Sequence, residues 1–347
     1  MRINISHLTL PENFHKITDF YIPSEAPLYG LMYPGPLQIM NMKEYADIVA
    51  VLLKEAKKSE SLEFALELYH EGKRIILRGH SIDSVEGKVF IFRRLPSYIP
   101  KIEEIGMPNN IIELLLNDRL NNGGLVIIAG ETGQGKSTTA AASIAYRLKT
   151  YGSFCLTIED PVELPLQGFY DNPTNPNVKG VCFQTNIDSD GISDAIKSSL
   201  RCYPAVSNSI LFLGETRDAA MASEVLKIAA NGHLVVTTMH GADLMIALRR
   251  FMNLAMSHKN ANENEVKAMF SSVFRLMIHQ RMETLQNGKK KIKPTVLFSP
   301  SSSSAIATRL RSGGLELLAT EIQNQNMILS KGGSLMNLSA TSSSSGV

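Results

Sequence analysis

The sequence of 347 residues has no tryptophan, only three cysteines and no bias of charge. Cys155, Cys182 and Cys202 form no CxxC pair and their number is odd, so they indicate neither a disulfide framework nor a zinc site. We interpret them as reduced, mostly buried thiols. The 35 basic and 33 acidic residues give a net charge of +2, which favours no class of partner.

Long hydrophobic runs are absent as well. No stretch approaches the roughly 18 apolar residues that a membrane helix needs, and the N-terminus lacks a charged start followed by an apolar core. We therefore expect a cytoplasmic protein with no transmembrane segment, which reaches a membrane only through a partner. The chain is also longer than one hydrophobic core usually supports, so two domains are expected.

The pattern along the chain predicts the domain boundaries. Residues 1–95 mix short β-rich runs with one helical stretch, Lys43 to Lys57, and close with the strands GKRIILRGHS and GKVFIFRRLP, which predicts a small α/β domain. Residues 96–105 contain prolines without periodicity and are assigned to a linker. Residues 106–335 form the second domain. The serine-rich residues 336–347 have little to bury and are predicted to be disordered.

The second domain alternates short apolar runs with helical stretches. The runs are LVIIA from Leu125, FCLTI from Phe154, ILFLG from Ile210 and LVVTTM from Leu234. Uninterrupted apolar strands are typical of a sheet that is buried on both faces. The sequence therefore predicts an α/β fold, with a parallel sheet between layers of helices.

A glycine-rich motif follows the first of these strands. It consists of Gly130, Glu131, Thr132, Gly133, Gln134, Gly135, Lys136 and Ser137, with Thr138 next in the chain, and it matches GxxxxGK[ST]. A helix follows, so strand, motif and helix stand in the order of a P-loop. Glycines let the backbone N–H groups turn toward phosphate oxygens, Lys136 neutralises the β- and γ-phosphates, and the Ser137 hydroxyl ligates magnesium. The predicted ligands are ATP and Mg²⁺.

Acidic and imidazole side chains follow the next predicted strands, at the edge where open α/β sheets bind ligands. Glu215 is placed to orient or deprotonate water, whereas Gly214 replaces the usual magnesium carboxylate, so magnesium would rely on Ser137, waters and the carboxylates Glu159 and Asp160. Asp218 is interpreted as a helix cap. For His240, position alone leaves catalysis and a structural hydrogen bond equally open.

Four segments in this order, GETGQGKSTT, TIEDPVEL, LGETRD and GHLVVTTMH, resemble the Walker A, Asp box, atypical Walker B and His box of type II and type IV secretion ATPases. The chain is most similar to the PilT-type retraction and the DotB- and TraJ-type secretion motors. The resemblance implies a PAS-like first domain, a RecA-like second domain and a homo-hexameric ring. It also implies that Glu163 and Glu215 are hydrolysis carboxylates, that His240 contacts the γ-phosphate, and that His233 is its companion at the interface.

In such motors, arginines of the first domain reach the nucleotide. Arg74, Arg78, Arg93 and Arg94 lie on the matching strands, and one or two of them are expected to act on phosphate. The alternative is a solvated charge pattern on edge strands. The basic run Lys289 to Lys291 is interpreted as a hairpin turn rather than as a nucleic-acid site.

The leading hypothesis is a cytoplasmic ring ATPase that drives a pilus or secretion machine through domain rotation. It would act at the cytoplasmic face of the bacterial inner membrane, on a platform or secretion-machine protein, without direct nucleic-acid binding. Two alternatives stay open: a RecA-like nucleic-acid motor, and a nucleotide-binding scaffold without turnover, which Gly214 makes conceivable. Pilus retraction and secretion are not distinguished, because residues 305–311 keep only part of a C-terminal motif of the retraction motors.

Overall fold

The structure, a computed structural model, describes residues 2–12, 14, 17–27, 30–33, 38–39, 42–59, 61–187, 192–199, 201–204, 209–259, 261–285 and 290–336. The chain forms two compact units, residues 1–98 and 99–347, and the division falls inside the segment that the sequence assigned to the linker. The tail predicted at 336–347 lies outside the described residues except for Met336, and Leu335 before it is buried. Among the described residues, no helix has the length and apolar character needed to cross a membrane.

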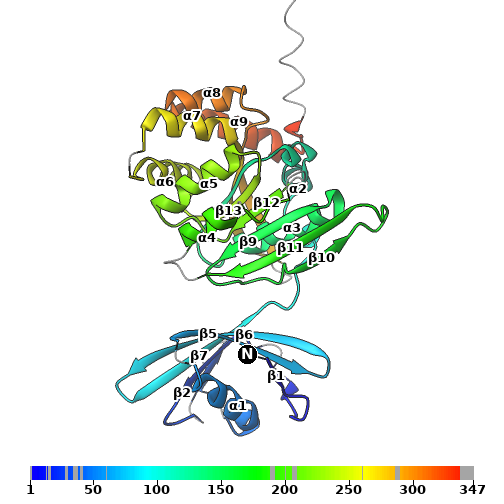
Figure 1. Cartoon of the computed structure of the whole chain (residues 1–347), viewed down its shortest axis with the longest axis vertical. Helices are drawn as coiled ribbons and strands as arrows, with labels where there is room; N and C mark the ends of the chain where they lie inside the picture. Colours follow the sequence, from blue (N-terminus) through cyan, green and yellow to red (C-terminus); the bar gives the residue numbers. More distant parts are fainter. Residues whose placement is uncertain are drawn as a thin grey trace, which may run out of the picture. The chain divides into compact units, whose positions relative to one another are not determined.

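In the part of the chain that the structure describes, the first unit is a sheet with the α-helix Ala46–Ala56 on one face (Figure 1). Its strand order is β1-β5-β6-β7-β2-β3-β4; β1 and β5 pair in parallel, and the other pairs of described strands are antiparallel. The strands are β1 (Arg2–Asn4), β2 (Asp19–Pro23), β3 (Leu31–Tyr33), β4 (Gln38–Ile39), β5 (Glu63–His70), β6 (Lys73–Ser84) and β7 (Gly87–Leu95). A 3-10 turn, η2 (Met42–Tyr45), leads into α1 (Ala46–Ala56), which buries Ile48, Val49 and Leu52 against the sheet. This helix lies within the predicted Lys43–Lys57 stretch.

The second unit is a larger sheet between layers of helices (Figure 1). Its strands are β8 (Gly124–Gly130), β9 (Ser153–Glu159), β10 (Gly168–Asp171), β11 (Lys179–Asn186), β12 (Ser209–Leu213), β13 (Leu234–His240), β14 (Phe274–Thr284) and β15 (Lys290–Phe298). Its α-helices are α2 (Asn109–Leu116), α3 (Lys136–Tyr151), α4 (Ile192–Ser199), α5 (Ala219–Ala230), α6 (Leu244–Met256), α7 (Glu263–Val273), α8 (Ala305–Ser312) and α9 (Leu318–Ser330).

The strand order of this sheet is β10-β11-β9-β12-β13-β8-β14-β15. The inner strands from β11 to β14 run parallel, and β10 and β15 pair antiparallel at the two ends. The predicted α/β fold with a parallel sheet is confirmed. Because β9, β12, β13 and β8 point the same way, the residues that follow them meet at one edge, which we call the carboxyl edge.

Alternate residues of β8 belong to different cores. Leu125, Ile127 and Ala129 pack with α5, α6 and α7, whereas Val126 and Ile128 pack with α2 and α3. The strand is buried along its whole length, which explains why its sequence is continuously apolar rather than alternating. The P-loop therefore begins at the end of a strand that packs against a hydrophobic core on each of its two faces.

Details of the second unit refine the sequence predictions. Asp218 caps α5 by accepting a hydrogen bond of 2.9 Å from the backbone N–H of Met221, as predicted. Lys290 and Lys291, predicted in a hairpin turn, belong instead to β15, because the antiparallel pairing with β14 extends to Thr284 and Lys290. Lys289 lies outside the described residues. The cysteines are free, with Cys155 and Cys182 buried and Cys202 exposed.

Candidate active site

The loop between β8 and α3 closes against β14. Gly130 and Gly135 have φ angles of 154° and 78°, a backbone conformation that residues other than glycine rarely adopt. A Cβ atom on Gly130 would lie 2.6 Å from the carbonyl oxygen of Gln280, and one on Gly135 would lie 2.8 Å from the Met282 side chain. Backbone conformation requires glycine at both positions, and at Gly130 the close approach of the β14 backbone requires it as well, whereas the Met282 side chain beside Gly135 is flexible.

Lys136 is the first residue of α3 and points back across the loop. Its Nζ donates a hydrogen bond of 2.9 Å to the carbonyl oxygen of Glu131, and the residue is 8% exposed. Burial lowers the pKa of the Lys136 ammonium, and the negative charges of Glu215 and Glu163 act in the opposite direction. A desolvated ammonium group beside the N-terminus of a long helix is suited to bind a phosphate group.

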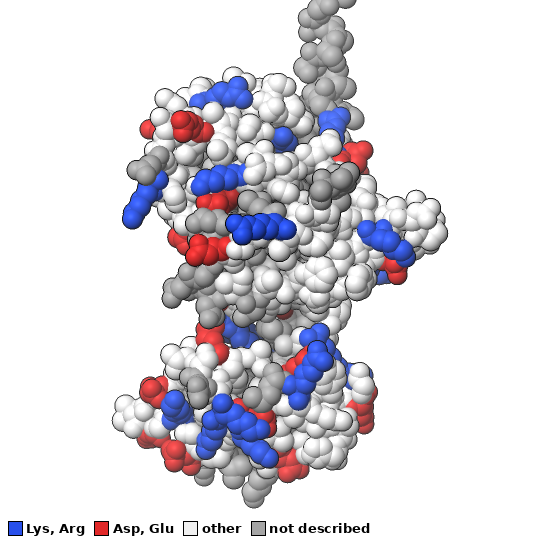
Figure 2. Space-filling model, viewed as in Figure 1, with Lys and Arg blue, Asp and Glu red and all other residues white. Residues whose placement is uncertain are grey.

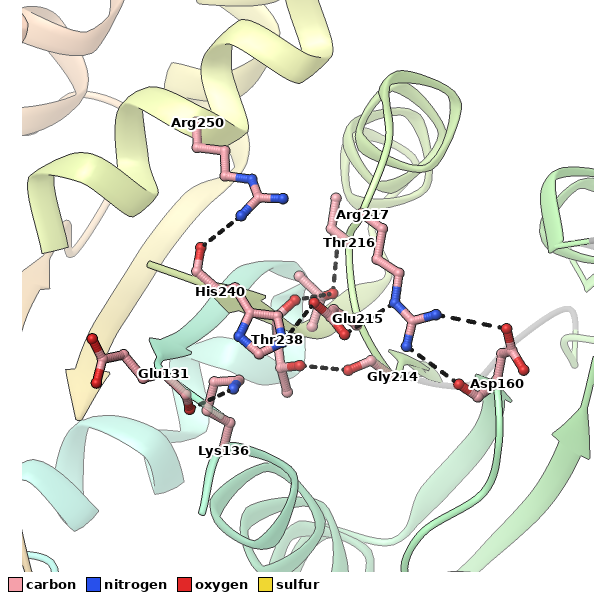
Figure 3. A network of polar contacts seen from close by, with 11 residues as sticks. Glu131, Lys136, Asp160, Gly214, Glu215, Thr216, Arg217, Thr238, His240 and Arg250 are labelled. Atoms are coloured by element: carbon pink, nitrogen blue, oxygen red, sulfur yellow. Dashed lines mark hydrogen bonds and ion pairs between the residues drawn. The ribbon is translucent and has the colours of Figure 1, made fainter. Parts of the chain in front are cut away.

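Glu215 lies at the centre of a charged cluster at the carboxyl edge (Figure 3). One carboxylate oxygen is 3.2 Å from His240 Nε2, and the other accepts a hydrogen bond of 3.0 Å from Arg217 Nε. Arg217 also approaches Asp160, with 3.6 Å between the guanidinium and the carboxylate. These residues follow or end β12, β13 and β9, so strands far apart in sequence assemble the cluster.

Threonines fix the turn that carries Glu215 (Figure 3). Thr238 Oγ1 donates a hydrogen bond of 2.6 Å to the carbonyl oxygen of Gly214, and the Thr216 N–H donates to the carbonyl oxygen of Thr238 at 2.9 Å. The hydroxyls of Thr216 and Thr237 are 2.9 Å apart, and both residues are buried. The backbone on each side of Glu215 is thereby tied to β13, which limits the positions of its carboxylate.

Gly214 takes the position of the usual magnesium carboxylate, and its lack of a side chain leaves room for the side chain of Glu159. A Cβ atom on Gly214 would lie 3.3 Å from Glu159 Cγ. Glu159 is 5% exposed, accepts a hydrogen bond of 3.0 Å from Gln184 Nε2, and has its pKa raised to about 7 by burial. Its carboxyl group is thus held by the protein and disfavoured in the charged form.

The residues predicted to bind magnesium can supply some of its ligands but not all of them. Ser137, Glu159 and Asp160 supply the oxygen atoms that magnesium prefers, but no cluster of three or more His, Cys, Asp or Glu side chains suited to a metal ion occurs in the described part of the chain. Asp160 is paired with Arg217. Magnesium commonly binds one or two protein oxygens together with substrate phosphates and water, and this site suits that mode.

Glu163 is exposed, and its charge acts on both Lys136 and Glu159. Its carboxylate is therefore within electrostatic range of Lys136 at the predicted phosphate site. His233, in contrast, precedes β13, at the opposite edge of the sheet from His240. Its Nδ1 contacts the Ser209 hydroxyl, its ring lies 4.5 Å from that of Tyr203, and burial lowers its pKa. The structure does not bring His233 to the P-loop of the same chain, because β13 separates them by about 20 Å at about 3.3 Å per residue.

The first-unit arginines are engaged within their own unit. Arg74 pairs with Glu67, Arg78 with Glu63 at 3.1 Å, and Arg93 with Asp19 at 2.7 Å. Arg94 differs from the other three. It donates a hydrogen bond of 2.9 Å to the Phe14 carbonyl oxygen, lies over the Phe14 ring, and has its pKa lowered by burial. Arg94 supports the core of the unit, whereas the other three guanidinium groups are partly exposed and pair with carboxylates, of which those of Glu67 and Asp19 are largely buried.

Sequence reasoning gave no role to several residues that shape the site. Arg217 stands only two residues after Glu215, and its spacing could have indicated a contact with that carboxylate. Gln184 and Gln280 carried no local signal, because they reach Glu159 and the P-loop from strands distant in sequence. These contacts depend on strand order, which a single sequence does not specify.

The sequence matches the profile of the family described as "Type II/IV secretion system protein" over residues 53–343. It is 27% identical over 325 residues to an uncharacterised Escherichia coli protein, YggR, covering 90% of this chain and 91% of that protein. It is 30% identical over 207 residues to the Pseudomonas aeruginosa type IV pilus retraction ATPase PilT, covering 59% of this chain and 54% of that protein.

Two solved structures share the fold over most of their length. The pilus retraction motor PilT with bound ADP has a TM-score of 0.68 and 22% identity, covering 98% of each chain. The Legionella pneumophila ATPase DotB has a TM-score of 0.66 and 20% identity, covering 92% of this chain and 89% of that one. The predicted RecA-like core beside a smaller α/β unit is in agreement with these folds.

Proposed function

Because the chain belongs to the type II/IV secretion system protein family, we propose that it hydrolyses ATP to ADP and phosphate and drives a pilus or secretion machine. The observation that carries the proposal is the position of Glu215. Its carboxylate is held between His240 and Arg217, and its charge acts on Lys136 at the P-loop. A P-loop alone would account for binding, whereas a carboxylate held beside it provides a group for activating water.

Each group has a defined part in this proposal. The N-terminal N–H groups of α3 and Lys136 bind the phosphates, for which Lys136 Nζ leaves the carbonyl of Glu131. Glu215 orients the attacking water or accepts its proton, and His240 donates to the γ-phosphate. Magnesium, bound by Ser137 with help from Glu159 or Asp160, would neutralise charge on the phosphate oxygens.

The assembly that we propose is a ring of six copies acting on a membrane partner at the cytoplasmic face of the inner membrane. Relatives of the chain include ATPases of type IV pili, which supports this setting. Arg74, Arg78 and Arg93 would serve the nucleotide of a neighbouring copy by exchanging their carboxylate partners for phosphate. The exchange is least costly for Arg78 and Glu63, because both side chains are partly exposed and such pairs contribute only about 0–1 kcal/mol. Glu67 and Asp19 are largely buried, so losing Arg74 or Arg93 leaves a carboxylate that is poorly solvated.

Phosphate release by the full-length chain tests the activity. Lys136→Ala should reduce turnover to less than about a tenth of wild type, because it removes the cation that neutralises negative charge on the transferred phosphoryl group. The fold should survive, as measured by circular dichroism. A folded Lys136→Ala protein with nearly full turnover would contradict the role of Lys136, and ATP binding without turnover in the wild type would favour the scaffold alternative.

Subunit mixing tests the ring. Specific activity should rise with protein concentration as rings assemble. A Lys136→Ala protein should restore partial activity to an Arg74/Arg78/Arg93→Ala protein, because mixed rings unite an intact P-loop with intact arginines. Arg94 stays unchanged, since it packs within its own unit. Activity that does not depend on concentration would contradict trans action.

The nucleic-acid motor is disfavoured by the distribution of charge. On the face shown in Figure 2, basic and acidic side chains are interspersed over both units. Nucleic-acid motors need clustered cations to neutralise phosphates. Hydrolysis stimulated by DNA, with a steep dependence on salt, would favour that alternative.

A further inference from the structure

The strand β14 contacts the P-loop from the side opposite to the carboxylate strands. It pairs in parallel with β8, so that His279 lies beside Ala129, next to the first glycine of the loop. Gln280 is fully buried, and its Nε2 donates a hydrogen bond of 2.6 Å to the carbonyl oxygen of Gln134. The backbone N–H of Met282 donates to Gln134 Oε1 at 2.5 Å. Gln134 is therefore held at two points, through its backbone and through its side chain.

The first of these hydrogen bonds sets the direction of a peptide group. In a trans peptide, the carbonyl of one residue and the N–H of the next point in opposite directions. Gln280 draws the carbonyl of Gln134 toward β14, so the N–H of Gly135 points away from β14. Gly135 is the N-terminal cap of α3, where backbone N–H groups are available to an anion.

The Gln280 amide is poorly explained as a stabilising feature of the core. Its Oε1 is buried and has no hydrogen-bond partner among the described residues. A buried acceptor without a donor lowers stability, and an apolar side chain of the same length would avoid that penalty. The amide therefore has a use that an apolar side chain lacks, which is the donor at Nε2.

The residues on either side of Gln280 hold a second part of the site. His279 Nε2 lies 3.1 Å from the carbonyl oxygen of Gly241, so Nε2 carries the proton, and the Arg281 guanidinium donates to the Ala242 carbonyl at 3.0 Å. These carbonyls belong to the turn after His240, whose own carbonyl accepts from Arg250 at 3.4 Å (Figure 3). One short segment of β14 thus holds both the P-loop and the turn that follows His240 by hydrogen bonds.

We propose that Gln280 is a positioning residue for nucleotide binding, which fixes the Gln134–Gly135 peptide so that the Gly135 N–H faces the phosphates. The inference rests on the proposed function, because it assumes that the P-loop binds nucleotide. Gln280 touches neither phosphate nor water in this role and acts only through the loop. Its loss should weaken nucleotide binding more than it weakens the fold.

Gln280→Met tests the donor, because methionine has a similar length and no amide. The dissociation constant for magnesium-ADP should rise about tenfold, the usual consequence of losing one well-placed hydrogen bond. The thermal midpoint of the protein without nucleotide should change little. The matched control is Gln325→Met. Gln325 is also buried, but its amide is paired on both sides with the backbone of Phe298, at 2.8 Å each. The control should lower the thermal midpoint and leave nucleotide affinity unchanged.

Gln280→Glu adds a readout that packing alone would not affect. A protonated carboxyl group can donate to the Gln134 carbonyl, whereas a carboxylate cannot. Affinity relative to wild type should therefore be lower at pH 8 than at pH 6. Wild-type protein that fails to bind magnesium-ADP would remove the proposed function itself. Wild-type binding with unchanged affinity in Gln280→Met, or with a pH-independent ratio in Gln280→Glu, would overturn the inference alone.

Discussion

The two edges of the second sheet hold polar side chains of different kinds, although the same strands connect them. At the carboxyl edge, Glu215, Arg217 and Asp160 form partly exposed charged contacts. At the opposite edge, where β9, β12 and β13 begin, Arg147 of α3 is 2% exposed and donates to the backbone carbonyls of Leu115 and Asn117 at 3.3 and 2.9 Å. The first arrangement can exchange its partners for a ligand, whereas the second is occupied by the backbone of the same unit.

The histidines at the two ends of β13 show the same difference. His240, at the carboxyl end, faces Glu215 and is partly exposed, whereas His233, before the amino end, contacts Ser209 and lies against the Tyr203 ring. Residue type alone does not separate them. The end of the strand at which each one lies, and the groups that it faces there, predict catalysis for His240 and a structural role within the chain for His233.

The largest effect should follow from Glu215→Gln, which keeps the size of the side chain and removes its charge. Turnover should fall about 10²- to 10⁴-fold, the usual contribution of general acid–base catalysis. ATP affinity should stay close to wild type, because the P-loop is untouched. Phosphate release and equilibrium binding of a fluorescent nucleotide measure the two quantities. Full turnover in the variant would place the chemistry elsewhere.

A smaller effect should distinguish the two histidines. His240→Gln should lower turnover about tenfold through loss of one transition-state contact, while the thermal midpoint changes little. His233→Gln should lower stability by about 1 kcal/mol through loss of the Ser209 contact, while turnover stays within about twofold. Phosphate release and thermal unfolding of both proteins check this. An equal loss of turnover in both would indicate that His233 serves the site of a neighbouring copy.

The smallest effect concerns pH and His279. Burial lowers its pKa in the folded protein, so the neutral form is favoured by folding. Its contribution to stability is present above the unfolded pKa of about 6.5 and is lost as the pH falls through the lower folded pKa. The thermal midpoint should therefore fall between pH 7 and pH 5 by more in the wild type than in His279→Gln. Parallel pH curves would show that His279 contributes nothing to this loss.

Much of the fold and of the site could be predicted from local sequence. The motif from Gly130 to Ser137 combines strand, loop and helix in one continuous segment, and Glu215 and His240 follow apolar strands whose burial shows in their composition. Asp218 was recognisable as a cap because capping depends on neighbours in sequence. In each case, the physical cause of the structure lies within a few residues of the position predicted.

The rest depended on contacts between distant segments. Gln280 reaches Gln134 only because β14 is inserted beside β8, and neither segment contains a sign of the other. His233 lies at the opposite edge of the sheet from the P-loop because β13 runs from His233 toward the P-loop. The resemblance to the His box of related motors indicates a role for His233 but does not reveal how far it lies from the P-loop of its own chain. Lys290 and Lys291 were misplaced for a similar reason, since the length of the β14–β15 pairing is decided by both strands together.

The most direct test of the central claim is an experimental structure of the full chain with magnesium and a non-hydrolysable ATP analogue. We expect the phosphates at the carboxyl edge, with Lys136 Nζ released from the Glu131 carbonyl and within about 2.7–3.2 Å of a phosphate oxygen. The Glu215 carboxylate should lie within hydrogen-bond distance of a water next to the γ-phosphate. Nucleotide bound at another place, or Lys136 still bonded to Glu131 with phosphate present, would contradict the account.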